Sequence, residues 1–264
     1  MQSKEEVLNK IKLKNERLTA NVSDPITKKT LKYSIVNEMT LWRAQTLFTK
    51  EPITIEWIRG FENNKVFFDV GANVGMYTIF AALNYNVNVY AFEPESNNFQ
   101  TLMDNIDQNN LNDFVIPFPI GISDKTELSN LQISKFEAGS SHHTVGKKLL
   151  DHKNLEIIPN NFSQGIFSTT LDDLCFKWNL PIPSYLKIDV DGIESKIIDE
   201  SKKTLSSSNL KSVLIEINEN REQDASIIKT FIKMGFSFDK DQVNDARRKS
   251  GPHAGYAEYL FIKK

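Results

Sequence analysis

The chain has 264 residues, of which 40% are hydrophobic and 25% are charged. These proportions are typical of globular proteins and exclude a largely disordered chain. The 32 basic and 34 acidic residues give a formal net charge of −2, whereas dedicated nucleic-acid binders usually carry a clear basic excess. The single cysteine, Cys175, excludes an internal disulfide and a cysteine-rich zinc site. We therefore expect a globular protein without a nucleic-acid partner.

The sequence contains no apolar stretch of the ~18–20 residues needed to cross a bilayer. Its longest apolar run covers only residues 79–83. The first six residues lack the apolar core of a secretory signal. We expect no membrane span and a cytoplasmic location, and the sequence favours no particular oligomeric state.

Residues 1–60 are rich in Lys and Glu and carry only scattered apolar side chains. This pattern predicts short helices. We interpret the segment as an N-terminal helical extension that covers one edge or the mouth of a single domain, which residues 61–264 form.

From residue 65 onward, strand and helix patterns alternate. Short apolar runs predict five strands, at residues 66–70, 87–92, 114–122, 185–190 and 213–217. Helical patterns lie between or after them, at residues 77–83, 99–106, 193–205 and 227–235. Two final strands, at residues 236–238 and 259–262, are separated by a polar loop and can pair antiparallel. The order predicts an α/β fold: a doubly wound, mostly parallel sheet that ends in a C-terminal antiparallel hairpin.

Two glycines follow the first of these strands. Gly71 permits a tight turn and the close approach of a ligand, and Gly75 lets the next helix pack closely. In open α/β sheets, ligands bind at the carboxyl ends of the strands. Glu93 ends the second strand, 22 residues after Gly71, where an acidic side chain can accept hydrogen bonds from ribose hydroxyls. Together these features indicate an adenosine-containing ligand.

The spacing of the glycines distinguishes between two such ligands. The dinucleotide fingerprint has glycines at its first, third and sixth positions, but here the third is Asn73 and the sixth is Met76. S-adenosylmethionine has no pyrophosphate and does not need the missing glycine, and Asp69 is a candidate partner for its ammonium group. We therefore favour S-adenosylmethionine. The alternatives are an NAD(P)-dependent oxidoreductase and a non-catalytic module that binds an adenosyl ligand.

Four segments resemble motifs of the FkbM-type methyltransferases and occur in the same order, at residues 68–78, 90–95, 169–174 and 186–194. The resemblance implies an S-adenosylmethionine-dependent methyltransferase with a seven-stranded Rossmann-like sheet. It also implies methylation of a hydroxyl group on a sugar, a glycan or a secondary metabolite. The sequence departs from the family at Asp191, where Glu is usual, and the resemblance does not cover residues 1–60.

We assign the cofactor site to the glycine turn, the end of the second strand and the turn after the third strand. The residues are Asp69, Gly71, Ala72, Asn73, Gly75, Tyr77, Glu93, Pro94, Ile122 and Ser123.

Methyl transfer to an alcohol requires alignment of the reacting atoms and gains from a base that removes the proton. Asp189 closes the fourth strand at the same edge of the sheet as Gly71, and Asp191 and Glu194 follow it. His142, in a polar loop, is a fourth candidate because imidazole titrates near neutral pH. The alternative is that one of the aspartates caps the next helix while Glu194 pairs with a lysine.

We assign no metal site, although Asp189 with Glu216 or Asn218 offers oxygen ligands that suit Mg²⁺. Ser140 and Ser141 are candidates for contact with the acceptor or with the carboxylate of the cofactor. We expect Trp42 to serve packing in preference to binding a sugar ring. We expect the basic run at residues 247–249 to be solvated, and the alternative is contact with an anionic substrate.

Overall fold

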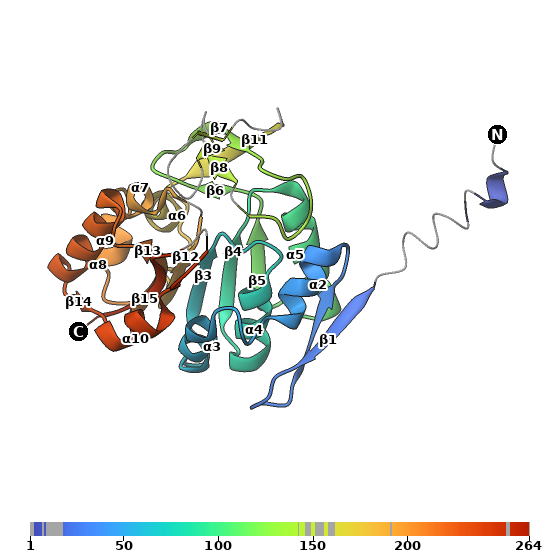
Figure 1. Cartoon of the computed structure of the whole chain (residues 1–264), viewed down its shortest axis with the longest axis horizontal. Coiled ribbons are helices and arrows are strands. Elements are labelled where there is room, and N and C mark those ends of the chain that lie inside the picture. The colour runs from blue at the N-terminus through green and yellow to red at the C-terminus, as the bar shows by residue number, and fades with distance from the viewer. Residues whose placement is uncertain are drawn as a thin grey trace.

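The computed structural model describes residues 3–6, 8, 18–141, 143–145, 149–150, 156–157, 162–190, 192–251 and 254–263. At its centre lies a seven-stranded sheet (Figure 1). In spatial order its strands are β14 (Phe236–Ser237), β15 (Tyr256–Lys263), β13 (Ser212–Asn218), β12 (Tyr185–Ile188), β3 (Val66–Val70), β4 (Asn88–Phe92) and β5 (Val115–Phe118).

Five neighbouring strands, from β13 to β5, are parallel. β15 is antiparallel to both of its neighbours, β13 and β14. This arrangement confirms the predicted Rossmann-like sheet with its C-terminal hairpin. The chain runs from β3 outward through β4 to β5, and then crosses back to β12 and β13 on the other side of β3. The strand order therefore reverses between β3 and β12, which is where open α/β sheets bind their ligands.

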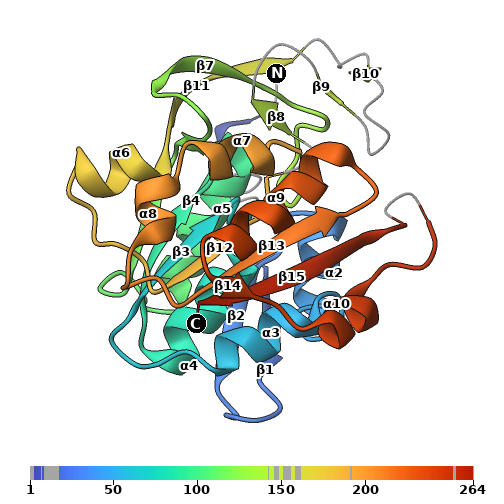
Figure 2. The same ribbon diagram turned by 90° about the vertical axis from the view of Figure 1, so that its left-hand side faces the viewer.

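Helices cover both faces of the sheet (Figure 2). Successive side chains of a strand point to opposite faces, and Phe67 and Phe68 of β3 accordingly belong to two different hydrophobic clusters. On the side of Phe67 lie α3 (Pro52–Arg59), α4 (Met76–Tyr85) and α5 (Ser96–Gln108). On the side of Phe68 lie α6 (Leu171–Phe176), α7 (Glu194–Asp199), α8 (Lys202–Ser206) and α9 (Glu222–Lys233). In the part of the chain that the structure describes, none of the helices combines the length and the apolarity that a membrane crossing requires.

A smaller sheet lies above the carboxyl ends of the central strands (Figure 1). It consists of β6 (Gly121–Ile122), β11 (Ser163–Thr169), β7 (Glu127–Gln132) and β8 (Thr144–Val145). A two-stranded pair, β9 (Leu149–Leu150) and β10 (Glu156–Ile157), completes this region. The predicted third strand is therefore wrong in its extent, because Pro119 lacks an N–H and separates β5 from β6.

Two further predictions differ from the structure in detail. The helix predicted over residues 193–205 is divided into α7 and α8 at Ser201, whose hydroxyl donates to the carbonyl of Ile197 at 2.6 Å. The polar stretch before β15 contains a further helix, α10 (Lys240–Ala246), which Asp239 caps.

The N-terminal extension contains the expected short helices, α2 (Glu38–Gln45) and α3, but also a hairpin of β1 (Thr19–Ser23) and β2 (Thr30–Ser34) that we did not predict. The second strand of the hairpin docks on α5, where the Ser34 N–H donates to Asn105 Oδ1 at 2.7 Å. Tyr33 is buried, and its hydroxyl donates to the Met76 carbonyl at 3.0 Å. The extension thus shares the core of the central sheet.

Candidate functional site

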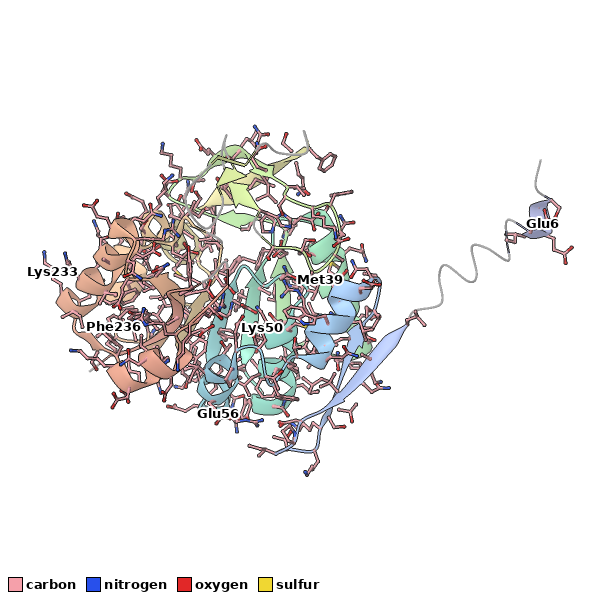
Figure 3. The ribbon with its side chains drawn as sticks, viewed as in Figure 1. Glu6, Met39, Lys50, Glu56, Lys233 and Phe236 are labelled. Atoms are coloured by element: carbon pink, nitrogen blue, oxygen red, sulfur yellow. The ribbon has the colours of Figure 1, made fainter. Side chains whose placement is uncertain are left out.

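A cavity of about 350 Å³ opens at the carboxyl ends of the central strands, between β3, β4, β12 and β13. This volume falls within the range of small-molecule sites. The strand ends and the turns after them contribute Gly71, Asn73, Glu93, Pro94, Gly121, Ile122, Asp189 and Glu216. The N-terminal extension and two loops contribute Met39, Trp42, Arg43, Lys50, Glu51, Ser140, Ser141, His143 and Arg248; Met39 and Lys50 are labelled in Figure 3.

The turn after β3 brings two strand ends together. Gly71 has a φ of +80°, and a Cβ atom there would lie 1.9 Å from the carbonyl oxygen of Asp189. Only glycine fits at this position, since both the backbone conformation and the space exclude a side chain. The turn continues to Asn73, whose φ is +53° and whose side-chain amide donates to the Ser140 carbonyl at 2.7 Å. Backbone atoms of the turn therefore form the base of the cavity, and the fixed side-chain amide of Asn73 forms part of its side.

Glu93 lies at the end of β4, and its buried carboxylate accepts two backbone hydrogen bonds. Oε2 accepts from the Asn73 N–H at 2.8 Å, and Oε1 accepts from the Glu95 N–H at 2.9 Å. Burial raises the pKa of Glu93 to about 7, although the two backbone donors oppose the shift. The Asn98 side chain also hydrogen-bonds this carboxylate, but with about four acceptor sites in all the group can still accept a hydrogen bond from a hydroxyl in the cavity. These features fit the ribose of an adenosyl ligand, as expected from the sequence.

Gly71, Asn73, Glu93, Pro94 and Ile122 line the cavity, and the other residues that we assigned to the cofactor do not. Ala72 is buried. Gly75 serves packing, because a Cβ atom there would lie 2.4 Å from Leu102 Cδ1. Tyr77 donates its hydroxyl to Glu51 at 2.8 Å, and Ser123 donates to Asp124 at 3.0 Å.

Asp69 is buried beneath the cavity instead of forming its wall. Its Oδ2 accepts a hydrogen bond from the Thr78 hydroxyl at 2.6 Å, and within the described residues Oδ1 has no hydrogen-bond partner. Burial raises its pKa, and the positive charge of Lys187 opposes that shift. The structure therefore does not bring Asp69 to the position of a cofactor ammonium group, and its role is in the support of α4 and Lys187.

Asp189 lies at the end of β12, with its side chain 36% exposed toward the cavity. The ammonium group of Lys187, itself buried, donates to Asp189 Oδ2 at 2.8 Å and lies 5.4 Å from the centre of the Tyr77 ring. Burial opposes the ionisation of Asp189, but the charge of Lys187 outweighs it and lowers the pKa to about 2. Asp189 is therefore a fixed negative charge at neutral pH.

The other predicted catalytic residues have different positions. The carboxylate of Glu194 accepts from the Gly192 N–H at 3.0 Å and from the Val190 N–H at 3.3 Å, and it does not line the cavity. Glu194 thus binds backbone N–H groups at the start of α7. This role is close to the capping alternative, except that Glu194 takes the place of the expected aspartate. Asp191 and His142 lie outside the described residues.

The residue after His142 does reach the cavity. His143 lines it, and His143 Nδ1 accepts a hydrogen bond from the Ser134 N–H at 3.3 Å. Ser140 and Ser141, our candidates for contact with the acceptor or the cofactor carboxylate, line the same wall.

Glu216 on β13 and Glu258 on β15 face each other across the two strands. Arg248 forms ion pairs with both, and it lines the cavity beside Glu216. Burial and then the negative charge of Asp189 raise the pKa of Glu216, whereas Arg248 opposes the shift. The expectation that residues 247–249 are solvated is wrong for Arg248, because these carboxylates hold its guanidinium.

The same arrangement bears on the Mg²⁺ alternative. Asn218 accepts hydrogen bonds from Asn220, and Asp189 and Glu216 are each paired with a cation. Across the described ranges, no three His, Cys, Asp or Glu side chains are grouped as metal ligands. The Mg²⁺ alternative therefore has no support here.

The sequence analysis placed the N-terminal extension at an edge or the mouth of the domain but did not identify which of its residues reach the cavity. Met39, Trp42 and Arg43 line the cavity from α2, and Lys50 and Glu51 line it from the start of α3. Trp42 is 43% exposed, so the expectation that it only serves packing is wrong. The one available signal was the spacing of residues 39, 42 and 43, which places them on one face of a helix.

Comparisons with known proteins agree with this geometry. Residues 69–238 match the methyltransferase FkbM domain. Hexuronic acid methyltransferase AglP of Haloferax volcanii is 24% identical over 187 residues, which make up 71% of this chain and 70% of AglP.

The chain is also similar to two solved structures, and this likeness concerns the fold alone. Precorrin-6y C5,15-methyltransferase of Geobacter metallireducens shares 15% identity, with 81% of this chain and 87% of that chain covered and a TM-score of 0.45. TYW2 of M. jannaschii in complex with AdoMet shares 13% identity, with 95% and 89% covered and a TM-score of 0.43. Because the FkbM match spans 170 of the 264 residues, the chain belongs to the methyltransferase FkbM family.

Proposed function

We propose that the protein uses S-adenosylmethionine to methylate a hydroxyl group of a sugar or glycan, with a secondary metabolite as the other acceptor class. The observation that carries the proposal is one cavity that is lined by the carboxyl groups of Glu93, Asp189 and Glu216. Family membership supports methyl transfer and disfavours the NAD(P)-dependent oxidoreductase. The similarity to AglP, whose name describes a hexuronic acid methyltransferase, supports a sugar acceptor.

The cofactor half of the cavity comprises Gly71, Asn73, Glu93, Gly121 and Ile122. In this proposal Glu93 accepts a hydrogen bond from a ribose hydroxyl, and the Gly121–Ile122 turn borders the adenine. Asn73 fills the place where a dinucleotide site has glycine, so the side chain favours an adenosyl ligand without a pyrophosphate.

The acceptor half comprises Lys50, Glu51, Asp189, Glu216 and Arg248. S-adenosylmethionine supplies an electrophilic methyl group and a neutral leaving group when it is bound. The residues of the acceptor half then have to orient the acceptor oxygen and accept its proton. Alignment of this kind contributes several kcal/mol to catalysis.

Asp189 and Glu216 suit different parts of that task. Asp189 has a pKa of about 2, which makes it a poor proton acceptor but a constant hydrogen-bond acceptor for the hydroxyl. Burial raises the pKa of Glu216, which makes its carboxylate a stronger proton acceptor than that of Asp189. We therefore assign orientation of the acceptor to Asp189 and removal of its proton to Glu216.

Thermal unfolding with S-adenosylmethionine, S-adenosylhomocysteine and NAD(P)⁺ added separately tests the cofactor. A ligand at 100 times its dissociation constant adds about 2.7 kcal/mol to the free energy of unfolding, so stabilisation by the adenosyl ligands alone is expected. Stabilisation by NAD(P)⁺ alone would overturn the proposal. Transfer of a labelled methyl group to p-nitrophenyl β-D-glucuronide and β-D-glucoside then tests the acceptor, and binding without turnover on any acceptor would favour the non-catalytic module.

Glu93→Ala tests the cofactor half directly. Loss of charge-assisted hydrogen bonds is expected to weaken S-adenosylhomocysteine binding by about 1–3 kcal/mol, as measured by titration calorimetry. Unchanged affinity would remove Glu93 from the cofactor site.

A further inference from the structure

We infer that Arg43 forms a carboxylate-binding site in the wall of the cavity, supplied by the N-terminal extension and not by the Rossmann-like sheet. The inference rests on the proposed function, because the carboxylate belongs either to the amino-acid end of the cofactor or to an acidic sugar. Among the described residues that line the cavity from the glycine turn and the strand ends, none is a cation.

Arg43 projects from α2 and is held by one nitrogen only. Its Nε donates to the carbonyl of Gly139 at 2.7 Å. Within the described parts of the chain, the two terminal nitrogens of the guanidinium have no hydrogen bond or ion pair, and neither is sealed from solvent. Arg43 lines the cavity, so the open end of its guanidinium is available to a ligand there.

The loop that holds Arg43 is itself fixed to the cofactor half. The Gly139 N–H donates to Asn98 Oδ1 at 2.7 Å, and the next carbonyl, that of Ser140, accepts from the side-chain amides of Asn73 and Asn98. On the other side, Asn37 donates to the Ala138 carbonyl at 2.8 Å. Four hydrogen bonds with three asparagine side chains therefore set the position of the guanidinium relative to the glycine turn. Such a pre-positioned group binds its ligand with little loss of conformational freedom.

The charges of the cavity give a second, independent argument. Each of the other cations near its wall forms an ion pair with a carboxylate: Lys50 with Glu51, Lys187 with Asp189, and Arg248 with Glu216. Arg43 is close enough to help lower the pKa of Asp189, but among the described residues it forms no ion pair of its own. A ligand with a negative charge at this place completes the pairing.

The geometry of the guanidinium indicates the chemistry of that ligand. Two parallel N–H groups match the two oxygens of a carboxylate and form a bidentate pair. Two sources supply a carboxylate in this cavity: the α-carboxylate of the cofactor, and the carboxylate of a uronic acid acceptor. Both sources predict that a carboxylate binds to the guanidinium of Arg43. The ligands used in the test distinguish the cofactor from the acceptor as its source.

The test compares Arg43→Gln with the unaltered full chain by titration calorimetry. Three probes are used: S-adenosylhomocysteine, 5′-methylthioadenosine, which lacks the amino-acid end, and glucuronate added to protein saturated with S-adenosylhomocysteine. Lys229→Gln removes the same charge from an exposed position on α9 and serves as the control. We expect Arg43→Gln to lower the affinity for one of the two carboxylate ligands by about tenfold to a hundredfold. The affinity for 5′-methylthioadenosine should stay within about twofold. Arg43→Lys should recover part of the lost affinity.

Each outcome decides between the sources or against the inference. Weaker S-adenosylhomocysteine binding with unchanged 5′-methylthioadenosine binding assigns Arg43 to the cofactor carboxylate, and weaker glucuronate binding alone assigns it to the acceptor. Equal weakening of S-adenosylhomocysteine and 5′-methylthioadenosine overturns the inference, because Arg43 then only holds the loop. Unchanged binding of all probes also overturns it and leaves the proposed function intact. If the unaltered protein binds neither adenosyl probe, the proposed cofactor is wrong. The affinities of the unaltered protein and Arg43→Gln for glucuronate then decide the role of Arg43. A lack of glucuronate binding to the unaltered protein would count against the inference.

Discussion

The cofactor half of the cavity takes its hydrogen-bonding groups from short stretches of backbone, whereas the acceptor half takes charged side chains from separate segments. In the cofactor half, the backbone N–H of Asn73 and the carboxylate of Glu93 are only 20 residues apart and bond directly. In the acceptor half, Glu216 reaches Arg248 from a different element. The contact of Asn73 with Glu93 is therefore formed within one β-α-β unit, whereas the pairing of Glu216 with Arg248 joins segments that are distant in the sequence.

The two halves also differ in how their charges are stabilised. Glu93 is held by backbone dipoles and its pKa is raised by burial. Asp189 is held by a buried lysine, and its pKa is lowered. Changes in the cofactor half should therefore alter affinity and local backbone geometry, and changes in the acceptor half should alter turnover and the balance of charge.

The largest expected effect is on turnover, in the acceptor half. Glu216→Gln keeps the size of the side chain but removes the base, so turnover is expected to fall by about 10²–10⁴-fold while the affinity for S-adenosylhomocysteine stays within about twofold. Since Glu216 must be ionised to accept a proton and its pKa is raised, the activity of the unaltered protein should rise with pH through that pKa. The rate of methyl transfer to p-nitrophenyl β-D-glucuronide as a function of pH measures both effects.

Glu258→Gln is the matched control for this prediction. Glu258 contacts the same arginine but does not line the cavity, so turnover should fall by less than about tenfold. Similar losses for both variants would mean that the pairing of Arg248 matters and that Glu216 is not the base.

The next effect concerns stability. Lys187→Met leaves Asp189 without its partner and removes the cation beside the buried Asp69. Breaking a buried ion pair in this way costs about 3–5 kcal/mol, and the lower end is expected because Asp189 opens on the cavity. Urea denaturation measures the loss. Lys177→Met, at an exposed i,i+4 pair, should change stability by less than about 0.5 kcal/mol, and equal losses would contradict a special role for Lys187.

The difference between the halves also explains what the sequence revealed. The sheet order and the cofactor half depend on local signals: a short apolar run, a glycine turn at Gly71 and an acidic residue at the next strand end. These signals act within one β-α-β unit, so periodicity and spacing identify them. Asp189 was found for the same reason, because it also ends a strand.

The acceptor half depends on contacts between distant residues. Arg248 follows a helix in a stretch that the sequence presents as a polar loop, and its contacts with the distant Glu216 and with β15 place it at the cavity. The β1–β2 hairpin was missed because its stability comes from docking on α5, through pairs such as Ser34 with Asn105. The place of Asp69 at a strand end suggested a ligand contact, but its carboxylate is buried, bonds the Thr78 hydroxyl and does not line the cavity.

A third prediction tests the backbone junction between the halves. Gly71→Ala introduces a Cβ 1.9 Å from the Asp189 carbonyl oxygen at a φ of +80°. Gly235→Ala has a similar φ of +85° but open space around the new atom. The conformational strain alone costs about 1–2 kcal/mol, so Gly235→Ala reports that cost, and Gly71→Ala should lose roughly 2 kcal/mol more because β3 and β12 must separate. Equal losses in urea denaturation would mean that the two strand ends move apart freely.

The smallest expected effect is a pH dependence that belongs to Glu93. Its pKa in the folded protein is about 7, above the usual value of 4.5, so ionisation is easier in the unfolded chain. The contribution to stability is fully present below pH 4.5 and is lost as the pH rises through 7. Between pH 5 and pH 8 the unaltered protein, without ligand, should therefore lose about 2 kcal/mol more than Glu93→Gln, which carries no charge at any pH. Asp69 and Glu216 also have raised pKa values, but they are present in both proteins and cancel in the comparison. Parallel curves of unfolding free energy against pH for the two proteins would show that the Glu93 carboxylate is solvated, and the ribose site would then lose the preorganised acceptor on which the cofactor half depends.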